Sequence, residues 1–245
     1  SYSDGNKPAK NFGFTPVNGH VEVLFLEHQG FSSLPDIIGN LGSLRRLFIT
    51  GNALTSLPSS IGSLSSLEVL TAGDNQLVSL PPSIGNLKSL KQLDLIHNAL
   101  VTLPPSIGNL KSLTRLGLDL NALETLPPEV GQLQSLRILN VSYNQLISLP
   151  AEVGELNQLE ELGAARNLLA ELPANLGKLK HLRFLQLDNN KLESLPKTLQ
   201  TLPALQRVEV THNPLTRLSE SMMKWIEKIN ANPYPPEDDP FKPTS

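Results

Sequence analysis

The chain contains no cysteine among its 245 residues. This absence excludes disulfide bonds, thiolate metal sites and cysteine nucleophiles. Aromatic residues make up only 4% of the chain against 39% hydrophobic residues, so a core must be built from aliphatic side chains. The net charge of −3 is nearly balanced, which argues against a nucleic-acid-binding protein. No run of about 18 apolar residues occurs, so the sequence predicts no membrane span and no membrane partner.

Proline, in contrast, is abundant, and its placement is periodic. Leu-Pro pairs recur every 23 residues from Leu34-Pro35 to Leu195-Pro196. The period defines nine units with the consensus LxxLxLxxNxLxxLPxxIGxLxx, the first starting at Val21. Units of this kind cannot bury their apolar side alone, and stacking joins them into one core. The ninth position is asparagine in all units but the first, namely Asn52, Asn75, Asn98, Asn121, Asn144, Asn167, Asn190 and Asn213.

These units resemble leucine-rich repeats, and the resemblance covers residues 21 to about 227. The Leu-Pro and Ile-Gly elements are similar to the intracellular Ras-group and scribble/erbin types, and bacterial and plant proteins carry similar units. The resemblance implies an α/β repeat fold, a right-handed curved solenoid with a parallel concave β-sheet and turns or short helices on the convex side. Within each unit the fourth and sixth positions point inward and the third, fifth and seventh outward. The asparagine amides are expected to form a ladder that satisfies backbone groups.

The two ends of the chain depart from the repeat. Residues 1–20 are predicted to form an N-terminal cap, a strand of a hairpin turning at Asn18-Gly19. Residues 21–218 hold the repeats, and the last unit merges into a capping helix at 219–231. Residues 232–245, with five prolines, are predicted to be a tail or linker. The capping helix is expected to cover the end of the core with Met222, Trp225, Ile226 and Ile229.

The sequence predicts no metal site, no cofactor and no catalytic residue. His28, His97 and His212 share the eighth position of their units. They are nevertheless three and five units apart, roughly 14 and 24 Å at a strand spacing of 4.8 Å, which is too far for shared ligation. Carboxylates of the strand face, such as Asp94 and Asp119, are interpreted as solvated binding residues rather than an acid/base pair.

The outward positions carry the functional information because packing does not dictate them. They mix apolar, aromatic and charged residues, a composition typical of protein interfaces. The central units supply the predicted partner-binding patch, which consists of Asp94, Ile96, His97, Arg115, Asp119, Leu120, Ile138, Asn140, Tyr143 and Arg166. A secondary patch, which the N-terminal segment with Phe12 and Phe14 is expected to cover, consists of Val23, Phe25, Arg46, Phe48 and Val69.

The sequence thus predicts a monomeric, non-catalytic protein-interaction module that binds a partner protein on its concave face. By family analogy alone, the partner is a small GTPase or a phosphatase. Two alternatives remain open. The chain is the targeting part of a larger enzyme, such as a kinase, a Roco-type GTPase or a ubiquitin-ligase effector, or it is a secreted or surface recognition protein of a plant or bacterium. The cytoplasm is the predicted compartment, because the cysteine-rich caps of animal extracellular relatives are lacking.

Overall fold

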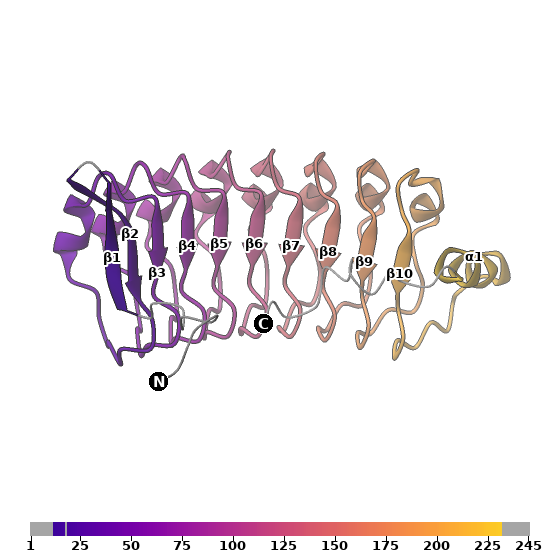
Figure 1. The fold of residues 1–245 in the computed structure, drawn as a ribbon. Helices are drawn as coiled ribbons and strands as arrows, with labels where there is room; N and C mark the ends of the chain where they lie inside the picture. Colours follow the sequence, from indigo (N-terminus) through magenta and orange to yellow (C-terminus); the bar gives the residue numbers. More distant parts are fainter. Residues whose placement is uncertain (1–11, 18, 232–245) are drawn as a thin grey trace, which may run out of the picture.

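The computed structural model describes residues 12–17 and 19–231. It is a single stack of repeats with one ten-stranded sheet in the order of the sequence (Figure 1). The strands are β1 (Phe12–Val17), β2 (His20–Leu26), β3 (Arg46–Phe48), β4 (Val69–Thr71), β5 (Gln92–Asp94), β6 (Arg115–Gly117), β7 (Ile138–Asn140), β8 (Glu161–Gly163), β9 (Phe184–Gln186) and β10 (Arg207–Glu209).

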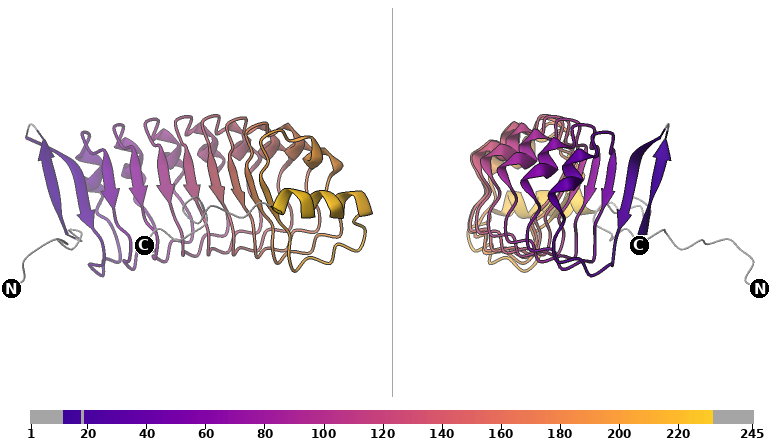
Figure 2. Two further views of the ribbon diagram at one scale, coloured as in Figure 1. Left: turned by 45° about the vertical axis from the view of Figure 1, so that its right-hand side comes forward. Right: turned by 90° about the vertical axis from the view of Figure 1, so that its left-hand side faces the viewer.

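Each repeat returns from its strand through a short 3-10 helix. These helices are η1 (Asp36–Asn40), η2 (Ser59–Ser63), η3 (Pro82–Asn86), η4 (Pro105–Asn109), η5 (Pro128–Gln132), η6 (Ala151–Glu155), η7 (Ala174–Lys178) and η8 (Lys197–Thr201). The strands from β2 to β10 run parallel, and the 3-10 helices lie on the other side of the stack (Figure 2). The predicted solenoid, with a concave parallel sheet and short helices on the convex side, is confirmed.

The register of the sheet follows the 23-residue period. Leu24 pairs with Leu47 and Leu47 with Leu70, so the inward leucines of successive strands stand side by side. Leu47, Leu70 and Leu93 are completely buried. The core is therefore a column of aliphatic side chains, extended by one layer with each unit, as an aromatic-poor chain requires.

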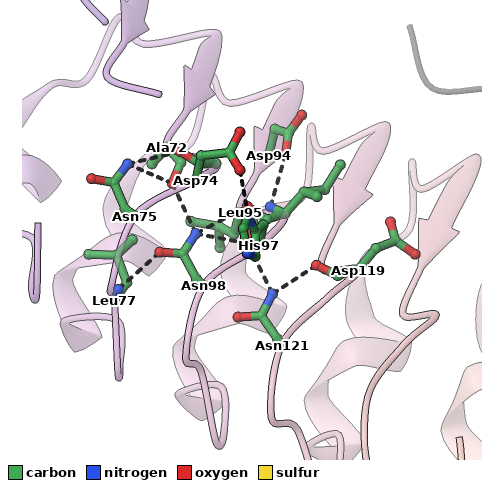
Figure 3. A network of polar contacts seen from close by, with 12 residues as sticks. Ala72, Asp74, Asn75, Leu77, Asp94, Leu95, His97, Asn98, Asp119 and Asn121 are labelled. Carbon is green, nitrogen blue, oxygen red and sulfur yellow. Dashed lines mark hydrogen bonds and ion pairs between the residues drawn. The ribbon is translucent and has the colours of Figure 1, made fainter. Parts of the chain in front are cut away.

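The recurring asparagines form a continuous hydrogen-bond ladder beside the core (Figure 3). Nδ2 of Asn98 donates to the carbonyl oxygens of Ala72 and Leu95, each at 3.0 Å. Its Oδ1 accepts from the backbone N–H of Leu77 at 2.9 Å. Each side chain thus joins its own turn to the preceding unit, and it satisfies backbone groups that no strand pairing reaches.

Proline begins every return segment. Each 3-10 helix follows a proline with φ between −72° and −60°, for example Pro35 before η1 and Pro196 before η8. The ring fixes this extended conformation, and the missing N–H is not needed at a helix start. The high proline content therefore stabilises ordered turns instead of indicating disorder.

At the N-terminal end, β1 pairs antiparallel with β2 and occupies the edge that β2 would otherwise leave open. Gly19 in the turn has a φ of 81°, a left-handed conformation that suits glycine. Asn18 and residues 1–11 of the predicted cap lie outside the described residues.

At the C-terminal end, the helix α1 (Glu220–Asn230) contacts β10. Ser219 caps it by accepting a hydrogen bond from the backbone N–H of Met222 at 3.2 Å. Met222 is buried, and Trp225 is partly buried against the core. Ile226 and Ile229 are also partly buried, because an amphipathic helix at the end of the stack contacts the protein on one side only. The predicted tail at 232–245 lies outside the described residues.

Candidate functional site

The predicted partner-binding residues fall into two structural groups. Asp94, Arg115, Ile138 and Asn140 lie on the strands β5, β6 and β7 at the outward third and fifth positions. The others follow the strands, where each chain turns toward its asparagine. This second group consists of Ile96, Asp119, His97, Leu120, Tyr143 and Arg166.

The eighth positions have a backbone that the sequence pattern did not predict. His97, Leu120, Tyr143 and Arg166 all have φ between 53° and 56°. A left-handed conformation costs a non-glycine residue roughly 1 kcal/mol. Hydrogen bonds to the next unit compensate this cost, because the N–H of Leu120 donates to Ser142 and that of Tyr143 to Ala165. The conformation ends the strand and turns these side chains along the rim of the sheet.

Three consecutive units present an exposed cluster on this rim. Leu120 is 44% exposed and Tyr143 48% exposed, although both are large apolar side chains. The guanidinium of Arg166 lies over the ring of Tyr143, 5.0 Å from its centroid. Such a pair holds the aromatic ring in one orientation and leaves its other face free for contact. We call Leu120, Tyr143 and Arg166 the rim cluster.

His97 is held by a charged neighbour in the preceding unit. Its Nδ1 lies 2.5 Å from Oδ1 of Asp74, which occupies the same eighth position one repeat earlier (Figure 3). Both side chains are exposed, so the pair contributes little to stability. Among the described residues, no group of three histidine, aspartate or glutamate side chains could hold a metal ion.

The two aspartates of the patch, Asp94 and Asp119, are only partly exposed. Burial raises the pKa of Asp119 to about 6, although its carboxylate accepts a hydrogen bond from the backbone N–H of Ser142 at 2.9 Å. Burial also raises the pKa of Asp94, which accepts from the N–H of Ile96. The cause is the partial burial of Asp119 at a seventh position and of Asp94 at a fifth position, which disfavours the charged form of each carboxyl group.

Asp119 should therefore make stability depend on pH. Its folded-state pKa lies above the value of 3.8 for an unperturbed carboxyl group, so the folded protein binds the proton more tightly. The favourable contribution is present below about pH 4 and is lost as the pH rises to about 6. We expect Asp119→Asn, which keeps an acceptor for Ser142, to gain about 1–2 kcal/mol over the wild type between pH 4 and pH 7. Urea unfolding across this range measures the difference.

An aspartate on the convex side provides the control for this prediction. Asp36 is exposed, so Asp36→Asn should follow the wild-type profile. A constant difference between Asp119→Asn and the wild type at all pH values would contradict the assignment.

The third-position residues of the patch border an open hollow on the sheet face. It has a volume of about 430 Å³, and Arg115, Ile138 and Glu161 line it from three adjacent strands. Asn140, which we expected to be accessible, is only 9% exposed. Its flanking partners on β6 and β8 are Gly117 and Gly163, which have no side chains to cover it.

The secondary patch is also assembled, at the N-terminal end of the sheet. Phe25 and Phe48 stack with ring centroids 5.0 Å apart and nearly parallel planes. Val23 and Val69 are partly buried and Arg46 is exposed. Phe14 on β1, which was expected to help to cover this patch, is itself 58% exposed. The side chain of Phe12 lies outside the described part of the chain.

The sequence interpretation missed a charge ladder along the second position of the units. Glu68 lies between Arg45 and Lys91, and Lys91 Nζ lies 2.8 Å from its Oε2. Hydrogen bonds from Lys91 and Arg45 lower the pKa of Glu68 to about 2. Arg137 and Glu160 repeat the pairing. The signal was present in the sequence as alternating charge at a spacing of 23 residues, but only stacking makes these positions neighbours.

Three models of leucine-rich repeats match parts of the chain, two of which overlap. The model "Leucine-rich repeat region" matches residues 19–100, and "Leucine rich repeat" matches residues 111–169. The repeat model of "Leucine-rich repeat and WD repeat-containing protein 1" matches residues 147–228. No curated protein matches the chain significantly. Within the described ranges, no helix combines the length and apolar character that a bilayer crossing needs.

Several solved structures are similar to this one. A leucine-rich repeat protein of Leptospira interrogans is 29% identical, with a TM-score of 0.52 over 82% of this chain and 74% of that protein. The ectodomain of the receptor kinase GASSHO1/SCHENGEN3 of Arabidopsis thaliana, in complex with CASPARIAN STRIP INTEGRITY FACTOR 2, is 32% identical. Its TM-score is 0.73 over 84% of this chain and 29% of the ectodomain.

The plant peptide hormone receptor RGFR1, in complex with RGF2, is also 32% identical, with a TM-score of 0.71 over 78% of this chain and 32% of the receptor. The chain thus spans about a third of the length of these receptor ectodomains. The repeat models, the similar structures and the stacked 23-residue units agree, and the chain belongs to the leucine-rich repeat proteins.

Proposed function

We propose that this protein is a non-catalytic interaction module that binds a partner protein through the rim cluster and the adjoining concave face. The observation that carries the proposal is the exposure of Leu120 and Tyr143 beside Arg166, which stacks on the tyrosine. Tyrosine and arginine are the residue types most enriched at interface hot spots. Nearby Asp119 and Arg115 supply charges of both signs, as protein interfaces require for orientation.

The similar receptors support a proteinaceous partner. The two plant ectodomains are solved in complex with RGF2 and with CASPARIAN STRIP INTEGRITY FACTOR 2. A curved stack of repeats provides one long continuous surface, which suits an extended ligand or a protein edge. Among the described residues, the hollow lined by Arg115, Ile138 and Glu161 is open to solvent, which suits a small molecule poorly.

The rim cluster can be tested without disturbing the fold. Leu120→Asp combined with Tyr143→Asn should weaken partner binding by about 2 kcal/mol, some thirtyfold. Aspartate and asparagine tolerate the left-handed backbone at these positions better than other residues. Affinity purification with mass spectrometry from the source cell identifies the partner. Calorimetry then measures the affinity of this partner for the wild type and for the double variant.

A matched control changes exposed apolar residues outside the patch. Val78 and Ile147 are 55% and 58% exposed and lie in the return segments. Val78→Asp with Ile147→Asn should bind the partner like the wild type. If the rim variant and this control bind the partner with equal affinity, the partner does not bind through the rim cluster.

The same purification separates the remaining alternatives. A small GTPase or phosphatase as partner would support the resemblance to the cytoplasmic Ras-group repeats. A secreted peptide or an extracellular protein would favour the second candidate, a recognition segment of a longer receptor. The similarity to plant ectodomains, of which this chain spans about a third, favours that candidate. The other alternative, that the chain is the targeting part of a larger enzyme, is compatible with a partner inside or outside the cell.

A further inference from the structure

The outward face of β3 to β7 separates its charges by their place along the strands. The second and third positions of each unit, where the strands begin, hold five cations and one carboxylate, namely Arg45, Arg46, Lys91, Arg115, Arg137 and Glu68. The fifth, seventh and eighth positions, where the strands end, hold the carboxylates of Asp74, Asp94 and Asp119 and neither lysine nor arginine. We call the first set of positions the entry row and the second set the exit row.

The cations of the entry row are only partly neutralised by neighbouring carboxylates. Arg45 and Lys91 share one carboxylate, that of Glu68. Within the described part of the chain, the side chains of Arg46 and Arg115 form no ion pair and no hydrogen bond. The entry row therefore keeps an excess of positive charge on the open face of the sheet.

The carboxylates of the exit row repel one another. Asp74, Asp94 and Asp119 come from successive units and lie beside each other along the stack (Figure 3). Burial is the main cause of the raised pKa of Asp94, and the charge of Asp74 adds to it. Burial likewise raises the pKa of Asp119, and the charge of Asp94 adds to that shift. Among the described residues, the one ion pair of these carboxylates joins Asp74 to the exposed side chain of His97, so cations from outside the protein would relieve the repulsion.

The two rows form a frame for an extended segment that crosses the strands. Each row follows five strands about 4.8 Å apart, which makes it roughly 19 Å long. A third and a seventh position of one unit, such as Arg115 and Asp119, are roughly 13 Å apart along an extended backbone. This distance exceeds the Debye length of about 8 Å at physiological ionic strength, so the fields of the two rows do not cancel. Successive side chains of an extended segment point to opposite sides, and a segment between the rows thus turns every second side chain toward the same row.

We propose that the face of β3 to β7 binds an extended segment of the partner protein in which acidic and basic side chains alternate. The acidic side chains face the entry row and the basic side chains face the exit row. A second copy of this chain fits less well, because the rims of two concave faces meet before the sheets do. This inference rests on the proposed function, since it names the chemistry of the partner for the same concave face.

Two peptides of identical composition test the alternation. The probe is an acetylated and amidated octapeptide in which glutamate and lysine alternate, and in the control peptide all glutamates precede all lysines. An extended octapeptide spans roughly 26 Å, which is enough to follow both rows. In calorimetry with the full-length chain at low ionic strength, the alternating peptide should bind about tenfold more tightly than the block peptide, and added salt should remove the difference. Equal affinities of the two peptides, or no binding of either, would overturn the proposal.

Removal of one charge from each row locates the peptide. Arg115→Gln and Asp94→Asn should each weaken binding of the alternating peptide about threefold to fivefold. Asparagine keeps an acceptor for the N–H of Ile96, so the turn after the strand is preserved. The matched controls on the convex side are Lys197→Gln on η8 and Asp36→Asn on η1, both exposed, which should bind the peptide like the wild type. If the controls weaken binding as much as the row variants do, the peptide does not lie between the rows.

Light scattering distinguishes a partner segment from a second copy. We expect a monomer at low and at high ionic strength. A dimer at low ionic strength that Arg115→Gln dissociates would overturn the proposal in favour of a second copy. The proposed function is tested separately, because the affinity of the rim variant for the purified partner does not depend on the peptides. If that variant loses its partner while the two peptides bind equally, the rim cluster remains the binding site and only the alternating segment is wrong.

Discussion

Replacing Asn144 with alanine is expected to lower the free energy of unfolding by at least about 3 kcal/mol. Asn144 is buried, and its Nδ2 donates to the carbonyl oxygens of Leu118 and Val141, each at 3.0 Å. Its Oδ1 accepts from the N–H of Leu123 at 2.9 Å. Alanine leaves these backbone groups without partners in the middle of the stack, and each unsatisfied group costs about 1–3 kcal/mol. Urea unfolding followed by circular dichroism measures the loss.

The neighbouring residue and the end of the ladder serve as controls. Gln145 is exposed, so Gln145→Ala should change stability by less than about 0.5 kcal/mol. Asn213 is only partly buried at the last rung, where water can replace its bonds, so Asn213→Ala should cost less than Asn144→Ala. If Asn144→Ala unfolds at the same urea concentration as Gln145→Ala, the ladder does not stabilise the stack.

Gly131→Ala is expected to destabilise the protein by about 3 kcal/mol, the upper end for overpacking a tight contact. A Cβ atom at this position would lie 2.3 Å from the carbonyl oxygen of Glu152 and 2.7 Å from its Cβ. The obstacle is the backbone of the next 3-10 helix, so no side-chain rotation relieves it. Six other glycines make the same close approach to the following unit, namely Gly39, Gly62, Gly85, Gly108, Gly154 and Gly177.

The sequence contains its own control for this interpretation. Gln200 on η8 occupies the position of these glycines, and no further 3-10 helix follows η8. Gln200 is exposed, so a side chain is tolerated there. For the experiment, Gly42→Ala is the matched change, since a Cβ there has no atom within 4 Å. It should be neutral or slightly stabilising. If Gly131→Ala is as stable as Gly42→Ala, the convex helices separate easily and the glycine does not set their spacing.

The site illustrates how far outward positions can be assigned from a repeat pattern. The period correctly placed Asp94, Arg115 and Ile138 on adjacent strands, because every unit repeats the same alternation. It did not predict that partial burial raises the pKa of Asp119, or that Arg166 stacks on Tyr143. Both features depend on side chains that lie 23 residues apart in the sequence. The consensus does not specify the outward residues, so it does not predict which side chain lies beside which in the next unit.

The sequence by itself determined the architecture of this protein. Each 23-residue unit repeats leucine, asparagine, proline and glycine at fixed positions, and each of these residues has one physical role. The interpretation of one unit therefore applies to all nine units. Only the tertiary structure decided how the surface behaves. The left-handed backbone at Leu120 and the charge ladder at Glu68 both involve contacts between neighbouring units. Such features depend on distances between residues far apart in the chain, which stacking sets and a linear pattern does not contain.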